Sequence, residues 1–379
     1  MGMNIRSNAN HLTISPEQIR LPSEESLFDL FNALRGSFFC IGPLLTRFGE
    51  AKIPLPGGCL IGSRPIDEHI NSLKKLGVIF QFKNNYLSAE VITPDKRLIG
   101  STINFQCKSV GATETLIMAA SLAKGTTILN NSAQEPEIID LANMLNLMGA
   151  RVKGAGSERI TIEGVASLKG CDYTVMPDRI EAGTYIIAGA MTGGDMTIDG
   201  IEHAHMGSFL DLLRSSGLNF DLKENKIQIN KNSNLNPLEV VTLPFPGFPT
   251  DLQAQICALA SLTPGLSVIT ERVYPSRFMH VPELLRMGAH ISLEGSSAII
   301  RGSKKLTGAP VMASDLRASA ALILAGLAAT GETWVQRIYH LDRGYENFEQ
   351  KLSRLGANVE RLPESELPKS ISSSNNLIN

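Results

Sequence analysis

The sequence has little of what nucleic-acid-binding, secreted or membrane-spanning proteins need. Its 35 Lys and Arg residues are offset by 37 Asp and Glu residues, a formal net charge of −2, so no general basic field attracts nucleic acid or an anionic membrane. Only five cysteines occur, none in a Cys-x-x-Cys pair, which argues against a disulfide framework and a zinc site. No apolar run reaches the roughly 18 residues that cross a bilayer. We therefore expect a cytoplasmic protein without a metal, which binds neither nucleic acid nor membrane.

The length and composition fit a globular protein of two domains. A chain of 379 residues, 43% hydrophobic and 19% charged, is long enough to form two sizeable cores. Because the net charge is close to zero, an anionic ligand must be held by a local group of arginines rather than by the field of the whole protein.

One short pattern recurs along the chain at a near-constant distance. In each copy a leucine stands four residues before a glycine at the end of an apparent helix, and the glycines lie about 70 residues apart, which indicates an internal repeat. Glycine just after a helix is a common C-cap, and strand-like sequence follows, for example at 79–82. The five glycines are Gly77, Gly149, Gly217, Gly288 and Gly356.

A second series of glycines falls earlier in each copy and predicts the order of elements. Apolar helices are expected to end at Gly49, Gly125, Gly194, Gly265 and Gly331. A short strand follows each of them, and two strands joined by a polar turn follow the second helix. The repeat therefore predicts a helix–strand–helix–strand–strand module of about 70 residues, with a further strand leading into it. One period before Gly77 falls near residue 7, so we expect the chain to begin at the tail of a first module whose body is absent.

A glycine-rich loop carries the first chemical signal. Residues 55–65 (LPGGCLIGSRP) present the thiol of Cys59 among glycines, five residues before Arg64. Glycines let a ligand approach the backbone closely. A guanidinium at that reach favours the thiolate and can bind a phosphate or carboxylate. From the loop alone, a plain surface turn and a reactive site both remain open.

Seven motifs, the cysteine loop among them, are long and specific. They are GGCLIGSRP (57–65), SVGATE (109–114), PDRIE (177–181), FPTDLQ (248–253), RFMHVPE (277–283), DLRAS (315–319) and HLDRGYE (340–346). Together they resemble the UDP-N-acetylglucosamine enolpyruvyl transferase family. The resemblance covers the chain from about residue 34 to residue 362.

The resemblance implies an α/β fold: a two-domain inside-out α/β barrel built from βαβαββ repeats, of which the first is incomplete. The first domain, which carries the cysteine loop, is expected at 1–176, and the second, with three modules, at 177–362. In the family a cleft between the domains holds the substrates. Residues 363–379, rich in Ser and Asn, are expected to be disordered.

The resemblance also implies the reaction. The enolpyruvyl group of phosphoenolpyruvate moves to the 3-hydroxyl of UDP-N-acetylglucosamine and phosphate is released, without a metal or cofactor. This is the first committed step of peptidoglycan synthesis, which links the protein to cell-wall formation, cell shape and cell division. The resemblance further implies that the epoxide antibiotic fosfomycin alkylates the loop thiol. It leaves the oligomeric state open.

Three catalytic residues are assigned by the resemblance. Cys59 would donate a proton to the methylene carbon of phosphoenolpyruvate and help to release the product. Asp251 would contact the attacking hydroxyl, either as a base or as an orienting group, and its position after Pro249 and Thr250 also fits a helix N-cap. Arg343 would hold phosphoenolpyruvate together with Arg64.

Further residues are assigned to the substrates in the same way. Arg35 and Arg317 match positions around the anionic groups of the two substrates. Lys108 stands one position away from a lysine of some family members. The nucleotide sugar is expected at Arg64, Pro65, Ile66, Asp67, Glu68, Cys107, Lys108, Ser109, Val110, Asp251 and Val273.

Two departures from the family pattern keep other functions open. The family has a Lys-Asn pair in its first module, whose lysine reaches phosphoenolpyruvate, and nothing in this sequence corresponds to it. Pro275 stands where many members have an acidic residue. One alternative is a truncated, non-catalytic homologue that binds UDP-N-acetylglucosamine. The other is an enolpyruvyl transferase for another acceptor, either another nucleotide or shikimate phosphate.

Overall fold

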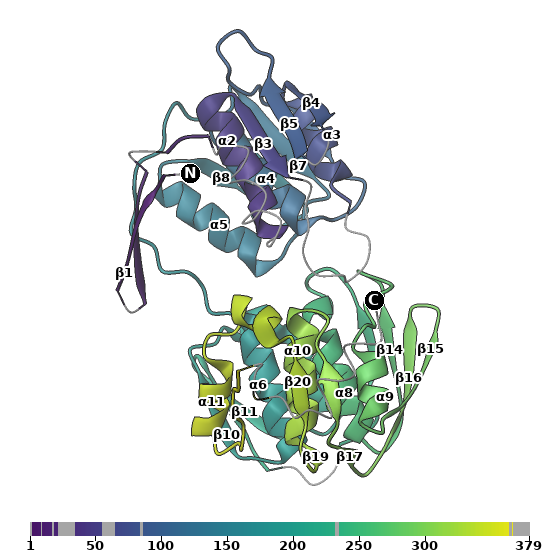
Figure 1. Cartoon of the computed structure of the whole chain (residues 1–379). Coiled ribbons are helices and arrows are strands. Elements are labelled where there is room, and N and C mark those ends of the chain that lie inside the picture. Colours follow the sequence, from purple (N-terminus) through teal and green to yellow (C-terminus); the bar gives the residue numbers. More distant parts are fainter. Residues whose placement is uncertain are drawn as a thin grey trace. The chain divides into compact units, whose positions relative to one another are not determined.

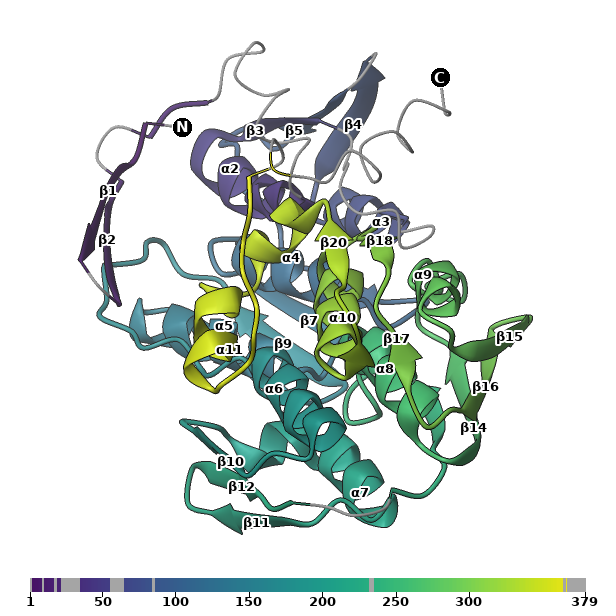
Figure 2. The ribbon, with the colours of Figure 1, turned by 60° about the horizontal axis from the view of Figure 1, so that its bottom comes forward.

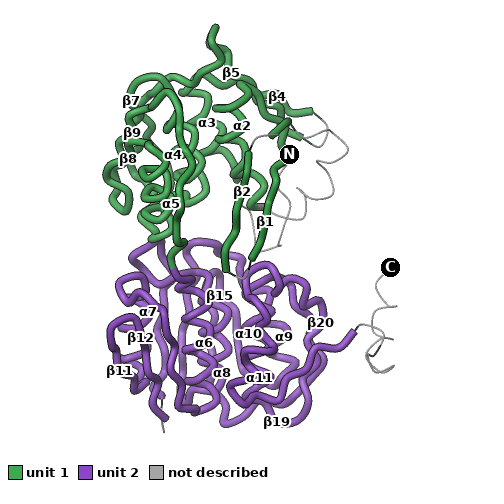
Figure 3. Tube along the Cα trace, turned by 90° about the vertical axis from the view of Figure 1, so that its left-hand side faces the viewer, with its two compact units in different colours: residues 1–58, 64–176 green, residues 59–63, 177–379 purple. Residues whose placement is uncertain are grey.

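The computed structural model describes residues 2–8, 10–16, 19–21, 35–54, 65–83, 86–231, 235–363 and 366. The described chain divides into two compact units, of which unit 1 ends at Met176 and unit 2 begins at Pro177 (Figure 3). Both units mix helices with parallel and antiparallel strands, so the predicted α/β class is confirmed. In the described ranges no helix is both long and apolar enough to cross a membrane.

Unit 1 contains a separate hairpin and two copies of the module (Figure 1). The hairpin pairs β1 (Asn4–Asn8) with β2 (His11–Ser15) in antiparallel register. The first copy contains η1 (Arg35–Cys40), α2 (Ile41–Phe48), β3 (Glu50–Pro54), α3 (Asp67–Lys75), β4 (Val78–Lys83) and β5 (Tyr86–Val91). The second copy contains β6 (Thr102–Asn104), α4 (Val110–Ala120), β7 (Thr126–Asn130), α5 (Pro136–Leu147), β8 (Arg151–Lys153) and β9 (Arg159–Glu163).

Unit 2 contains two copies of the module and a third group that, within the described residues, has no strands after its second helix (Figure 1). The first contains α6 (Arg179–Thr192), β10 (Met196–Asp199), η2 (His203–Met206), α7 (Gly207–Ser215), β11 (Phe220–Lys223) and β12 (Lys226–Ile229). The second contains β13 (Glu239–Thr242), η3 (Thr250–Leu252), α8 (Gln253–Leu262), β14 (Gly265–Glu271), α9 (Val281–Arg286), β15 (His290–Glu294) and β16 (Ser297–Gly302). The third contains β17 (Leu306–Thr307), β18 (Pro310–Met312), α10 (Leu316–Leu327), β19 (Ala329–Thr330), β20 (Trp334–Gln336), η4 (Ile338–Arg343) and α11 (Phe348–Arg354).

The sheets repeat one pairing scheme. In the sheet β6-β7-β9-β8, the leading strand β6 is parallel to β7, and β9 lies antiparallel between β7 and β8. The sheet β13-β14-β16-β15 has the same order and directions. The described strands of β3-β5-β4 and β10-β12-β11 follow the scheme without a leading strand. The βαβαββ repeat predicted from the glycine spacing is therefore present in both units.

The later series of glycines marks the ends of helices as predicted, whereas most of the earlier series does not. All five glycines of the later series have a positive φ, between 85° and 101°, and the helix before each of them ends two residues earlier. In the earlier series the capping glycine of α6 is Gly193, with φ 67°, and not Gly194. The helices α4 and α8 end several residues before Gly125 and Gly265, because a short connection precedes β7 and β14. The helix α10 ends four residues before Gly331, and the short strand β19 lies between them.

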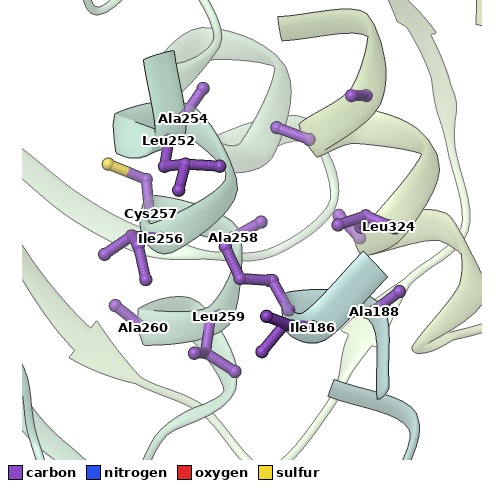
Figure 4. Packing of buried hydrophobic residues seen from close by; sticks show 14 of the residues in the cluster. Ile186, Ala188, Leu252, Ala254, Ile256, Cys257, Ala258, Leu259, Ala260 and Leu324 are labelled. Atoms are coloured by element: carbon purple, nitrogen blue, oxygen red, sulfur yellow. The ribbon is translucent and has the colours of Figure 1, made fainter. Parts of the chain in front are cut away.

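Unit 2 places its most apolar helices inside and its sheets outside. The helices α6, α8 and α10 contact one another, and their middle turns are buried on nearly every side (Figures 2 and 4). A helix that is apolar all round needs such surroundings. Small side chains in α8, such as Ala258 and Ala260 in Figure 4, let the neighbouring helices approach closely. This arrangement brings the first turns of the inner helices, where the motifs lie, into one part of unit 2.

Motif residues begin three helices, one in unit 1 and two in unit 2. Ser109 caps α4, Asp178 caps α6 and Asp315 caps α10, each with its side chain accepting hydrogen bonds from backbone N–H groups of the first turn. The expected cap at Asp251 is wrong. Its carboxylate makes no capping bond in η3, because it is bonded to arginines instead.

Two glycines at equivalent places hold a strand end against the inner-helix layer. A Cβ added to Gly302 would lie 1.6 Å from the carbonyl oxygen of Thr263, and one added to Gly164 would lie 1.8 Å from that of Ala123. Backbone carbonyls cannot move aside as a flexible side chain can. Both positions therefore require glycine.

We predict that Gly302→Ala destabilises the protein by about 3 kcal/mol or more, because the methyl group overlaps a backbone oxygen. Gly207 is the matched control in the same unit, since it has helical backbone angles and no atom within 4 Å of an added Cβ. Gly207→Ala should be neutral or more stable by up to ~1 kcal/mol. Urea-induced unfolding of both variants checks this, and equal effects would contradict it.

Candidate active site

A carboxylate held between two arginines forms the centre of the polar cluster in unit 2. Arg277 donates from Nη1 to Oδ1 of Asp251 at 2.7 Å. Arg317 donates to Oδ2 of Asp251 from Nη2 at 3.1 Å and from Nε at 3.3 Å. Each carboxylate oxygen thus has its own guanidinium, and charge-assisted bonds of this kind are among the strongest in proteins.

The cluster is open on the carboxylate side. The side chains of Arg277 and Arg317 are 7% and 12% exposed, whereas that of Asp251 is 39% exposed. Burial would raise the pKa of Asp251, but the charges of Arg317 and Arg277 outweigh it and hold that pKa well below its usual range. An ionised carboxylate that a ligand can reach, backed by two buried cations, is therefore the chemical character of this site.

Buried polar groups surround the two arginines. His280 is 2% exposed, and burial lowers its pKa to about 4, with Asp315 opposing and Arg277 adding to the shift. The guanidinium of Arg317 lies 5.4 Å from the ring centre of Tyr345. Tyr345 in turn shares a hydrogen bond of 2.8 Å with Thr184 of α6. These contacts tie the start of α10 to the rest of the inner layer.

Two further predicted residues of unit 2, Arg343 and Val273, lie at the end of η4 and in the turn after β14. Arg343 is exposed at the end of η4, where its Nη2 lies 3.5 Å from Nδ1 of His340. Val273 follows β14, and its backbone N–H donates to Glu271 at 2.8 Å. The turn that contains Val273 leads directly to Arg277, whose backbone N–H donates to the carbonyl of Tyr274.

In unit 1 the predicted nucleotide-sugar residues form a second cluster. Glu68, in the first turn of α3 after Asp67, accepts hydrogen bonds from the backbone N–H of Gln106 at 2.9 Å and of Cys107 at 3.2 Å. Burial, and then the nearby Glu68 carboxylate, raise the pKa of the Cys107 thiol. Lys108 forms an ion pair with Glu158 at 2.9 Å.

The remaining members of that cluster lie at the starts of α3 and α4. Ser109 accepts from the N–H of Ala112 at 3.3 Å and so caps α4, which begins at Val110. Pro65 and Ile66 stand just before α3. The structure thus brings Glu68 and Cys107 together, two residues that are far apart in the sequence.

Several predicted residues lie outside the described residues. These are Cys59 and Arg64, and the side chain of Arg35. Sequence reasoning also missed Arg277, which binds Asp251, Thr250, which accepts from Arg277, and Glu271, which accepts from Thr250. Arg277 and Thr250 stand inside two of the quoted motifs, so those motifs contained the signal. Glu271 stands in no motif.

No group of three or more His, Cys, Asp or Glu residues is arranged to hold a metal ion within the described part of the chain. The pair His203 and His205 in η2 has separate surroundings: Nε2 of His203 lies 3.0 Å from the carbonyl oxygen of Lys226, whereas Nδ1 of His205 is buried without a hydrogen-bond partner.

The known proteins that this chain is similar to are named as carboxyvinyl or enolpyruvyl transferases. The family model described as EPSP synthase (3-phosphoshikimate 1-carboxyvinyltransferase) matches residues 1–352. UDP-N-acetylglucosamine 1-carboxyvinyltransferase 2 of Prochlorococcus marinus is 53% identical over 361 residues, 95% of this chain and 84% of the relative. The UDP-N-acetylglucosamine 1-carboxyvinyltransferase of Nitratidesulfovibrio vulgaris is 48% identical over 96% of this chain and 86% of the relative. The crystal structure of the enolpyruvyl transferase NikO from Streptomyces tendae has a TM-score of 0.82 and 26% identity, over 95% of this chain and 85% of that one.

Glu114 gives a test of the electrostatics next to the unit 1 cluster. It lies in α4, and burial raises its pKa to about 7, with Glu137 and Glu135 adding to the shift. A carboxyl group with a raised folded-state pKa costs stability as the pH rises from about 4.5 to 7, because the folded state then holds a proton that the unfolded state has released.

We therefore expect Glu114→Gln to raise the free energy of unfolding at pH 8 by on the order of 1–3 kcal/mol and to change it little at pH 4.5. Glu90→Gln, which removes an exposed carboxylate of β5 in the same unit, is the control and should give no comparable gain at pH 8. Denaturant unfolding at both pH values measures the difference. A gain that is equal at both would refute the assignment.

Proposed function

The chain belongs to the EPSP synthase family and, within it, to the UDP-N-acetylglucosamine 1-carboxyvinyltransferases, and we propose that it transfers the enolpyruvyl group of phosphoenolpyruvate to the 3-hydroxyl of UDP-N-acetylglucosamine. The observation that carries this acceptor is the 53% identity over 95% of the chain to a relative of that name. In the reaction a C–O bond forms to the sugar, the bond to phosphate breaks, and the hydroxyl proton is released. The product serves peptidoglycan synthesis.

We assign to Asp251 the orientation of the attacking hydroxyl. Its carboxylate is exposed enough to accept a hydrogen bond from a ligand, and the two arginines keep it ionised. A carboxylate whose pKa lies well below its usual range is a weak base, so it is poorly suited to remove the proton fully. Of the two roles that the resemblance left open, the orienting role fits this electrostatic setting better.

The other assignments follow the resemblance. Cys59 donates the proton to the methylene carbon, and Arg64 and Arg343 hold phosphoenolpyruvate. Arg317 has its first task in binding Asp251, so its contribution to substrate binding is made through that carboxylate as well as by its own charge. The unit 1 residues, Glu68 and Cys107 to Val110, are assigned to the nucleotide sugar.

Phosphate release tests the function directly. With phosphoenolpyruvate, the chain should release phosphate only when UDP-N-acetylglucosamine is added and not with shikimate 3-phosphate. The rate should be low, because no residue of this sequence matches the family lysine that reaches phosphoenolpyruvate. Binding of UDP-N-acetylglucosamine without turnover would support the non-catalytic alternative. Turnover with shikimate 3-phosphate alone would support the other acceptor.

Asp251→Asn should lower kcat by about a hundredfold or more, because the amide cannot supply the negative acceptor to the hydroxyl. Asp199→Asn is the matched control, since Asp199 also forms an ion pair, at 2.7 Å with Lys226, but on the exposed strand β10. It should leave kcat unchanged. If the wild-type rate fell as the pH was lowered with a midpoint between 5 and 7 that was absent in Asp251→Asn, Asp251 would be the base instead.

Cys59 should be the first thiol to react with fosfomycin. Burial raises the pKa of Cys40 and of Cys257, and the pKa of Cys107 is raised as well, so these three carry little thiolate at neutral pH. Mass spectrometry of digested protein should place the adduct on Cys59, and Cys59→Ser should lose it. An adduct mainly on Cys107 would contradict the assignment.

A further inference from the structure

Glu271, the last residue of β14, is a fully buried carboxylate that makes four hydrogen bonds. Its Oε1 accepts from the hydroxyl of Thr242 at 2.5 Å and from the backbone N–H groups of Val273 and Tyr274 at 2.8 and 2.9 Å. Its Oε2 accepts from the hydroxyl of Thr250 at 2.9 Å. Within the described chain it forms no ion pair. A buried carboxylate without a cation is costly unless its acceptors are filled, and here hydrogen bonds fill them.

One of these bonds leads directly to the Asp251 cluster. The hydroxyl of Thr250 donates its single proton to Glu271, so it can only accept from the opposite side. There it accepts from Nη1 of Arg277 at 3.0 Å. The same Nη1 donates to Oδ1 of Asp251 at 2.7 Å. A continuous chain of donors thus runs from Arg277 to both Asp251 and, through Thr250, Glu271.

The other bonds fix the segments that carry the cluster. The N–H groups of Val273 and Tyr274 hold the start of the turn that ends at Arg277. Thr242 anchors the end of β13, and its hydroxyl also accepts from the N–H of Arg272. Glu271 therefore joins three backbone segments, which are the end of β13, η3 with Asp251, and the turn with Arg277.

We propose that Glu271 is a positioning residue for the transfer reaction: through Thr250 and the turn after β14, it fixes the distance and direction between Arg277 and Asp251. This inference rests on the function proposed above, in which Asp251 orients the acceptor hydroxyl. The negative charge matters because a carboxylate accepts from all four donors. An amide would present an NH₂ group to one of them.

The substitution Glu271→Gln should therefore disturb one particular hydrogen bond, the one from Thr250. The three donors at Oε1 keep the amide oxygen there, so the NH₂ group faces Thr250. The Thr250 oxygen then accepts from two sides and its own proton has no acceptor, which weakens the link to Arg277. Thr250→Val breaks the same link from the other end at nearly constant volume. Both variants act on one path.

The experiment measures kcat and KM for UDP-N-acetylglucosamine and phosphoenolpyruvate in the full chain. Glu271→Gln and Thr250→Val should each lower kcat by ~10–100-fold, the loss expected when a reacting group is misplaced by about 1 Å, with smaller changes in KM. The double variant should lose no more than the larger single loss, because both changes cut the same path. Thr250→Ser restores the hydroxyl and should recover most of kcat.

Ser267→Ala is the matched control for a lost buried hydroxyl on the same strand. Ser267 accepts from the N–H of Leu238 at 2.9 Å and so joins the region of β13 to β14 without contacting the Asp251 cluster. It should keep the wild-type kcat. An equal loss in Ser267→Ala, additive losses in the double variant, or a failure of Thr250→Ser to recover would overturn the proposal.

Crystal structures of the variants test the positioning role of Glu271 independently of the proposed function. If the wild-type chain releases no phosphate, the proposed function fails, and the contact between Arg277 and Asp251 still decides the role of Glu271. That contact, 2.7 Å in the wild type, should lengthen or break in Thr250→Val and stay in Ser267→Ala. An unchanged contact in Thr250→Val would overturn the positioning role whatever the activity.

Discussion

The ion-pair triad of Asp251, Arg277 and Arg317 is the interaction on which the chemistry of unit 2 depends. It binds three chain segments that lie far apart in the sequence, with Arg317 placed 66 residues after Asp251. Two nearly buried guanidinium groups need a negative partner, since unpaired buried charges are strongly unfavourable. The partner they have is a carboxylate with an exposed side. The same contact thus stabilises the fold and presents an ionised acceptor to a ligand.

The module explains how such distant residues meet. Each copy buries its first helix and leaves its strands outside, so the starts of the inner helices in unit 2 are neighbours although the chain between them is long. Motifs at those starts supply two kinds of residue. Asp178 and Asp315 cap the helices, whereas the residues that follow or precede the caps, such as Arg317, reach toward the site.

Much of this could be predicted from the sequence. The spacing of the later series of glycines predicted five helix ends, because a left-handed residue after a helix is strongly specified by local sterics. The motif at 315–319 predicted Arg317 as a site residue. Which partner Arg317 binds could not be predicted, because that depends on how separate modules pack. Glu271 gave no signal at all, since one acidic residue at the end of an apolar strand has no periodicity or motif, and only its four bonds in the folded chain distinguish it.

The inner position of α6, α8 and α10 has a consequence for how unit 2 folds. In a solenoid each repeat contacts only its neighbours and has a stability of its own. Here each module contributes a helix that packs on the strands of its own module and on the inner helices of the other two, so no single module encloses the core. Unit 2 is a repeat structure in its chain order but one cooperative body in its energetics, and the loss of one module's inner helix exposes the helices of the other two.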